Sequence, residues 1–89
     1  MKRTRVRIHG RVQGVFFRAE ARSRAESLGI AGWVRNAPDG SVEALFDGEP
    51  DRVDSMVEWC RRGPSGAHVT EVEVFEDEAG QAERGFRVL

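Results

Sequence analysis

The chain has 89 residues, of which 39% are hydrophobic and 33% are charged, and its net charge is −1. This composition is typical of a soluble globular protein, and the length suits a single core, so we expect residues 1–89 to form one domain. No apolar run reaches the roughly 18 residues of a membrane helix, and the near-neutral charge argues against a protein that lives by binding nucleic acid or membranes.

The spacing of apolar residues predicts five strands and two helices. Alternating apolar and polar residues are typical of half-buried strands, and apolar residues at i, i+3 and i+4 are typical of helices. In chain order we first expect a strand over residues 3–9, a loop over 10–14 and a helix over 16–28. Next come a hairpin of two strands over 30–47, with its turn at 37–40, and a helix opened by 48–51 and closed by Arg61 and Arg62. The chain ends with a strand over 70–75, a polar turn over 77–84 and a short strand over 86–88.

This order of elements predicts an α+β fold of the ferredoxin-like, split βαβ type (βαββαβ). Two helices then pack on one face of an antiparallel sheet, and a short extra strand follows at the C-terminal end. We expect Cys60 to be buried filler on the apolar stripe of the second helix, and we expect four aromatic side chains in the core: Phe17, Trp33, Phe46 and Phe86. Many unrelated functions use this fold, so function has to be argued from the site.

The loop that joins the first strand to the first helix is the first candidate site. No Ser, Thr, Asp or Asn between Gly10 and Phe17 can cap the helix, so its first amides lack a side-chain partner and favour an anion. Gly10 and Gly14 let the backbone fold closely around a guest, and the planar guanidinium of Arg18 suits two phosphate oxygens. The alternative is an ordinary glycine-containing turn followed by a solvated arginine.

The charge distribution is consistent with an anion site in this part of the chain. Residues 1–36 carry nine basic and two acidic side chains, whereas residues 37–89 carry five basic and thirteen acidic ones. The alternative is that the two halves fold together and neutralise each other.

Asn36, at the end of the second strand, is the second candidate. In a right-handed βαβ crossover the two strands run parallel, so their carboxyl ends share one edge of the sheet. If one strand separates them, the gap is about 10 Å, which a side chain and a substrate can span together. The alternative is that Asn36 merely caps the hairpin turn.

Two further kinds of site are not expected. His9 and His68 show no metal spacing, and the lone Cys60 excludes a disulfide framework and fits a reducing cytoplasm. An RNA-binding sheet would expose aromatic side chains on its central strands. The open face here instead carries opposite charges on neighbouring strands, which predicts cross-strand ion pairs; its residues are Arg3, Arg5, Arg7, Glu43, Leu45, Glu71 and Glu73.

The two candidate segments resemble the signatures of the acylphosphatase family. The first signature, G-x-V-Q-G-V-x-F-R, is matched by Gly10, Val12, Gln13, Gly14, Val15, Phe17 and Arg18. The second, G-W-V-x-N followed by G-x-V and a later glycine, is matched by Gly32, Trp33, Val34, Asn36, Gly40, Val42 and Gly48. The similarity runs the whole chain. Two small departures, Ser65 in place of a frequent proline and an early end at Leu89, are expected not to touch the site.

The resemblance implies hydrolysis of the carboxyl–phosphate bond of small-molecule acyl phosphates, with no metal or organic cofactor. Carried over by position, Asn36 orients the attacking water, and the phosphoryl group is bound by the Arg18 side chain and by the backbone N–H groups of Gln13, Gly14, Val15, Phe16, Phe17 and Arg18. Inorganic phosphate and sulfate would compete for this site, and we expect a cytoplasmic monomer. The main alternative is a non-catalytic module that binds phosphate or another anion on the same fold.

The residue types in the candidate site suit such a substrate. They offer no obvious general acid, general base or nucleophile. A carboxylate leaving group has a conjugate-acid pKa of about 4, so it departs without being protonated, and positioning with charge stabilisation can suffice. Phosphate monoesters, whose alkoxides are poor leaving groups, should be hydrolysed badly.

Overall fold

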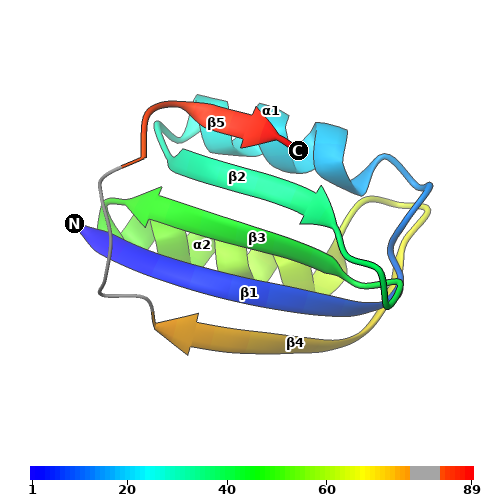
Figure 1. The fold of residues 1–89 in the computed structure, drawn as a ribbon. Coiled ribbons are helices and arrows are strands. Elements are labelled where there is room, and N and C mark those ends of the chain that lie inside the picture. The colour runs from blue at the N-terminus through cyan, green and yellow to red at the C-terminus, as the bar shows by residue number, and fades with distance from the viewer. Residues whose placement is uncertain (77–82) are drawn as a thin grey trace.

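The structure, a computed structural model, describes residues 1–76 and 83–89. Its elements, drawn in Figure 1, are β1 (Lys2–Arg11), α1 (Phe17–Ser27), β2 (Ala31–Asn36), β3 (Val42–Gly48), α2 (Pro50–Arg62), β4 (His68–Glu76) and β5 (Phe86–Val88). All seven predicted elements are present, in the predicted order. Most of the polar turn predicted over 77–84 falls on residues 77–82 and so lies outside the described residues.

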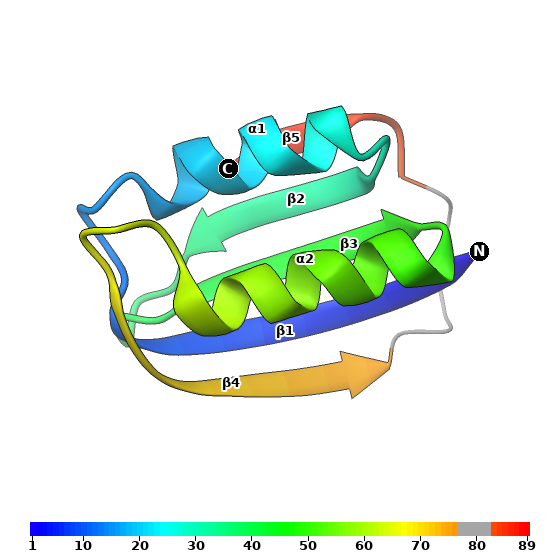
Figure 2. The same cartoon turned by 180° about the vertical axis from the view of Figure 1, so that it is seen from behind.

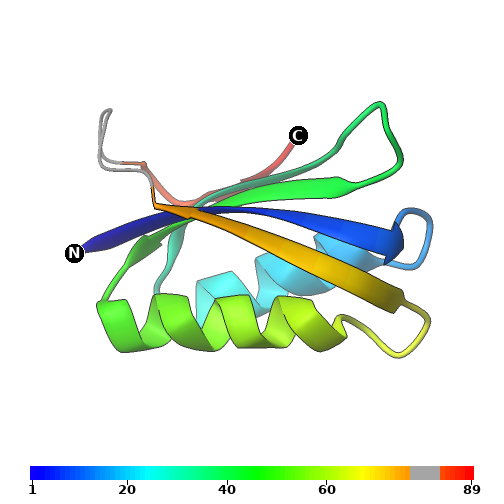
Figure 3. The ribbon, with the colours of Figure 1, turned by 90° about the horizontal axis from the view of Figure 1, so that it is seen from below.

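The strands form one sheet in the order β4-β1-β3-β2-β5. β1 is antiparallel to both β3 and β4, and β2 is antiparallel to β3, so β1 and β2 run parallel with β3 between them. The short β5 extends the sheet by pairing parallel with β2. Both helices cover the same face of the sheet, as the views from behind and from below show (Figures 2 and 3). This arrangement confirms the predicted α+β fold.

The core lies between the helices and this face of the sheet. Apolar side chains of all three central strands meet the inner faces of both helices there; the fully buried ones include Val6, Ile8, Phe17, Ala21, Val34, Val42, Phe46, Val53, Met56 and Cys60. Cys60 is buried as predicted, and its burial raises the pKa of the thiol. Trp59, which the predicted stripe of α2 omits, packs on the Phe17 ring with centroids 5.1 Å apart.

The opposite face of the sheet is held together by ion pairs around Glu43. This carboxylate, in β3, has a side chain only 7% exposed and lies 2.6 Å from Arg35 Nη2, 2.9 Å from Arg5 Nη1 and 3.5 Å from Arg7 Nη2. Burial by itself raises the pKa of Glu43, but the hydrogen bonds and charges of the arginines outweigh it and hold that pKa below its ordinary value. The predicted cross-strand ion pairs are thereby confirmed.

Trp33 is not in the core, and that prediction is wrong. Its neighbour Val34 points toward the helices, so the alternation of the strand places the indole on the opposite face, where it is half-buried. There it lies beside Leu45, its partner in the β2–β3 register, and Leu45 is buried although it belongs to the face predicted to be open. Alternation gives the two sides of a strand but does not tell which aromatic side chain faces the helices.

Candidate active site

The end of β1 is shaped by a β-bulge at Gly10. The β1–β4 register shifts between His9 and Gly10, and Gly10 adopts a φ of +123°. A Cβ atom at this position would lie 2.1 Å from the carbonyl oxygen of His68, so only glycine lets the two strands approach this closely. Gly10 and Arg11 therefore belong to β1, and the loop predicted to begin at Gly10 begins instead at Val12.

The N-terminus of α1 has no side-chain cap. Phe16 occupies the cap position in the left-handed conformation, with φ 63° and ψ 21°, and no side chain in the described part of the chain bonds to the amides of the first turn. The helix consequently starts at Phe17, one residue later than predicted. Gly14 also has a positive φ, of +75°, and Val12 is buried at the base of the loop. This is the uncapped turn predicted from the sequence, and its amides can serve an anion.

Arg18 stands in the first turn of α1, two residues after the cap. Its Nη1 atom donates a hydrogen bond to the carbonyl oxygen of Leu89 at 3.2 Å, and the Leu89 amide in turn bonds to Val34 of β2. The orientation of the guanidinium is therefore set in part by Leu89, the residue that follows β5. The expectation that Leu89 lies away from the site is wrong, because the sequence gives no sign that the last residue returns to the first helix.

Asn36 lies at the same edge of the sheet as this loop. Asn36 pairs with Val42 of β3, and Val42 pairs with Ile8 of β1, so one strand separates β1 from Asn36, which meets the condition set in the sequence-based prediction. Figure 1 shows the loop after β1 and the β2–β3 turn converging at this edge. The two backbones are two strand spacings apart at that row, about 10 Å.

The turn after Asn36 is capped by another residue. The amide and hydroxyl of Ser41 both donate to Asp39 Oδ1, at 2.9 and 2.6 Å. These hydrogen bonds hold the pKa of Asp39 below its ordinary value. No hydrogen bond joins the Asn36 carboxamide to any group in the described part of the chain. The alternative role of Asn36 as the turn cap is thus filled by Asp39, and the carboxamide is available to a ligand.

The side chain of Gln13 joins the loop to this turn. Its Nε2 atom donates to the carbonyl oxygens of Ala37 and Ser41, both at 2.9 Å. From the sequence, only the backbone amide of Gln13 was expected at the site, and the role of its side chain was not foreseen. The partners are backbone carbonyls 24 and 28 residues away, so no local sequence signal could have identified them.

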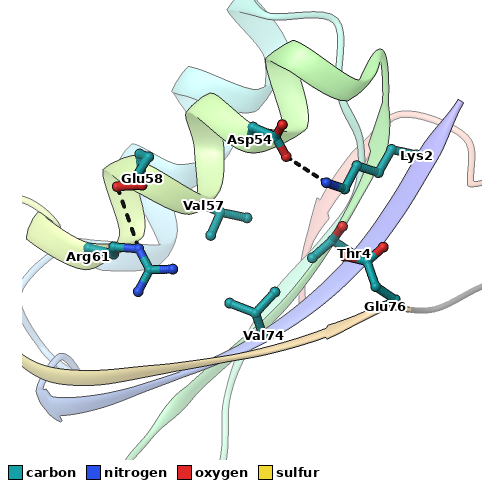
Figure 4. Close-up of a pocket in the computed structure, with 8 residues that line it drawn as sticks. All are labelled: Lys2, Thr4, Asp54, Val57, Glu58, Arg61, Val74 and Glu76. Carbon is teal, nitrogen blue, oxygen red and sulfur yellow. Dashed lines mark hydrogen bonds and ion pairs between the residues drawn. The ribbon is translucent and has the colours of Figure 1, made fainter.

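Other polar groups in the described residues form no comparable site. No three His, Cys, Asp or Glu side chains lie together as a metal site would require, within residues 1–76 and 83–89. His9 is paired with Glu73 at 2.6 Å. A cavity of about 400 Å³ lies between α2 and the sheet, at the start of β1 rather than its end (Figure 4), and ion pairs of 2.8 Å (Lys2–Asp54) and 3.5 Å (Arg61–Glu58) form part of its lining.

The family of the chain follows from comparison with known proteins. The family model described as acylphosphatase matches residues 4–88. The chain belongs to the acylphosphatase family. An acylphosphatase of Rubrobacter xylanophilus is 59% identical over 87 residues, which are 98% of this chain and 79% of that relative. One of a Roseiflexus species is 52% identical over 89 residues, 100% of this chain and 96% of the relative.

Solved acylphosphatase structures have the same fold. The crystal structure of the acylphosphatase from Bacillus subtilis superposes with a TM-score of 0.94 at 35% identity, and the match covers 100% of this chain and 99% of the other. The chain is accordingly an enzyme, an acylphosphatase, as the resemblance of its two motifs implies. Neither helix of its described residues is long and apolar enough to cross a membrane.

Proposed function

We propose that this acylphosphatase cleaves acyl phosphates without a metal, with the phosphoryl group held by the loop before α1 and by Arg18, and with the attacking water held by Asn36. The observation that supports this proposal is that the uncapped N-terminus of α1, with Arg18 in its first turn, lies at the same edge of the sheet as Asn36, whose carboxamide has no partner in the described residues. In this proposal the loop amides and Arg18 bind the phosphoryl group, and Asn36 binds the water.

The loop and Arg18 are suited to the dianionic phosphoryl group. The amides of the first helical turn have no intrahelical acceptor, and no side chain within residues 1–76 and 83–89 takes that place in α1. The positive end of the helix dipole adds to their attraction for an anion. In this proposal the N–H groups of Gln13 to Arg18 surround the phosphoryl oxygens, and the Arg18 guanidinium exchanges its bond with Leu89 for two of those oxygens.

Asn36 is suited to hold a water molecule. A carboxamide cannot take up a proton at neutral pH, but its oxygen accepts a hydrogen bond from water and its nitrogen donates one. With no partner in the described residues, both functions are free, and the separation of about 10 Å from the end of β1 leaves room for water and phosphorus between them.

The chemistry then needs no further acid or base. The water oxygen attacks phosphorus while the bond from phosphorus to the acyl oxygen breaks, and the electron pair leaves with the carboxylate. The carboxylate is a weak base, so it departs unprotonated, and the proton of the water passes to a phosphoryl oxygen of the substrate. Catalysis consists of positioning and of stabilising the charge on the phosphoryl oxygens.

The surroundings of the site support small-molecule substrates over nucleic acid. Arg5, Arg7 and Arg35 on the open face each lie within 3.5 Å of the Glu43 carboxylate, so a phosphate of an RNA backbone would have to compete with it. We further propose that the enzyme acts as a monomer in the cytoplasm, where the single buried cysteine stays reduced. Gel filtration at micromolar concentration tests the monomer.

A metal-free assay tests the proposed function. The purified chain is incubated with acetyl phosphate or benzoyl phosphate in the presence of EDTA, with a simple alkyl phosphate as the control substrate. We expect hydrolysis of both acyl phosphates at a rate unaffected by EDTA, competitive inhibition by inorganic phosphate and sulfate, and little hydrolysis of the alkyl ester. A strong loss with EDTA would instead require a metal, and phosphate binding without turnover would indicate the non-catalytic module.

A further inference from the structure

The Gln13 carboxamide is the point at which the two halves of the proposed site touch. The nitrogen of a carboxamide carries two hydrogens, and Gln13 Nε2 directs them to Ala37 O and Ser41 O, both at 2.9 Å. Both bonds are partly buried, so water competes poorly for them. No other side-chain hydrogen bond in the described residues links loop 12–16 with the β2–β3 turn.

The two acceptors belong to the closing pair of the turn that follows Asn36. The Ala37 amide donates to Ser41 O at 2.8 Å, so Ser41 O accepts from both Ala37 and Gln13. Ala37 and Ser41 are buried, and Asp39 fixes the Ser41 amide from the other side. These hydrogen bonds fix the backbone of the turn, and Asn36 immediately precedes its first residue, Ala37.

The loop that carries Gln13 is held to the core by the buried side chain of Val12, but the described residues give the amides of the loop no comparable backbone hydrogen bonds. Residues 12–16 lie outside both β1 and α1, so their amides are not held by a regular hydrogen-bond ladder. The sheet fixes Asn36 relative to the end of β1, but it does not fix the turn of backbone that is proposed to surround phosphorus. A displacement of about 1 Å at a reacting atom can lower a rate by about 100-fold.

We propose that Gln13 is a positioning residue that sets the distance between the phosphate-binding loop and Asn36, and so places the water in line with phosphorus. The inference rests on the proposed function, because it gives Gln13 a role only through the water that Asn36 holds. If Gln13 has this role, loss of its side-chain donors should leave phosphate binding intact and slow the attack of the water on phosphorus.

The test begins with Gln13→Met, which keeps the length of the side chain and removes both donors. We expect kcat for acetyl phosphate to fall at least about 10-fold, while the inhibition constant of inorganic phosphate changes less than about twofold, because Arg18 and the loop amides remain. Gln13→Asn keeps a carboxamide but shortens the side chain by one methylene, and it should shift kcat in the same direction. Thermal unfolding confirms that each variant is folded.

The matched control is Ser27→Ala. It also removes a side-chain donor to a backbone carbonyl, the bond from Ser27 Oγ to Arg24 O at 2.9 Å, but at the far end of α1. Both kcat and the phosphate inhibition constant should equal those of the unmodified enzyme. If Gln13→Met and Gln13→Asn also left kcat unchanged, or raised the phosphate inhibition constant as much as they lowered kcat, the positioning role would be overturned.

A double-mutant cycle separates this role from general support of the loop. In an Asn36→Ala background, measured at high enzyme concentration, Gln13→Met should lower kcat by no more than about twofold, since no held water remains to be misplaced. Equal fold losses in both backgrounds would overturn the inference and leave the proposed function standing. Wild-type turnover by Asn36→Ala itself would overturn both.

Discussion

Ile8 of β1 and Asn36 of β2 lie in one row of the sheet with only β3 between them, because both pair with Val42 of β3. Backbone hydrogen bonds of three strands thus fix Asn36 relative to the end of β1, from which the chain passes through the loop to Arg18. In the proposed mechanism Arg18 binds the phosphoryl group and Asn36 holds the water. Substitutions of these two side chains should accordingly separate binding from turnover.

Arg18→Ala should remove both phosphate affinity and activity. Loss of a charged donor to the transition state lowers rates by at least about 100-fold, and the remaining amides hold a dianion poorly without the guanidinium. The measurements are kcat/KM for acetyl phosphate and the inhibition constant of inorganic phosphate. Arg22→Ala is the control, because Arg22 stands one turn later on α1 and, among the described residues, pairs only with Glu26 at 3.3 Å. It should behave as the unmodified enzyme. Activity retained by Arg18→Ala would contradict the phosphate-binding role.

Asn36→Ala should lower turnover at least about 100-fold while leaving inorganic phosphate binding nearly unchanged. The reason is that the carboxamide contacts the water and not the phosphoryl group in the proposed mechanism. Phosphate titration by isothermal calorimetry, beside a kcat measurement, distinguishes the two effects. Normal kcat in this variant would show that another group positions the water.

Gly10→Ala and Gly14→Ala should differ in their effect on stability, although both glycines have a positive φ. At Gly10 a Cβ atom would meet the carbonyl of His68 at 2.1 Å, whereas at Gly14 it would meet nothing within 4 Å. We expect a loss of unfolding free energy of about 3 kcal/mol for Gly10→Ala and about 1 kcal/mol for Gly14→Ala, from backbone strain alone. Urea unfolding of both variants checks the difference, and equal losses would argue against a close β1–β4 approach at the bulge.

Glu43→Gln should destabilise the sheet. The amide would leave Arg5, Arg7 and Arg35 facing one another without the carboxylate that now offsets part of their charge. The arginine side chains are partly hydrated, so we expect a loss of about 2 kcal/mol, less than for a fully buried pair. Glu26→Gln, which breaks only the exposed pair with Arg22, should change the free energy of unfolding by less than about 0.5 kcal/mol.

Stability should also fall in acid, in part through Glu43. Its pKa in the folded protein lies below its ordinary value of 4.5, so the folded state releases this proton more readily than the unfolded chain does. The stabilisation is present above about pH 4.5 and is lost as the pH falls through the lower folded-state pKa; Asp39, whose pKa is also lowered, acts in the same sense. The stability gap between the unmodified enzyme and Glu43→Gln should therefore narrow below pH 4.5. A constant gap down to about pH 3 would contradict this assignment.

Local patterns were sufficient for the elements and for the family. Alternation and helical spacing predict every strand and helix, and the two signatures predict the acylphosphatase family that the relatives confirm. Element ends were less well predicted, and β1 extends beyond its predicted end because a bulge at Gly10 continues its pairing with β4. A bulge depends on the partner strand, which a local pattern does not contain.

The sequence by itself determined which residue types stand at the site: an uncapped turn with two nearby glycines, Arg18, and an asparagine that ends a strand. It could do so because capping, glycine conformation and strand periodicity are properties of neighbouring residues. Only the tertiary structure decided that Gln13 reaches Ala37 and Ser41, that Leu89 meets Arg18, and that Trp33 faces away from the helices. Those contacts join segments far apart in the chain, and they exist only once the sheet register and the packing of α1 bring the segments together.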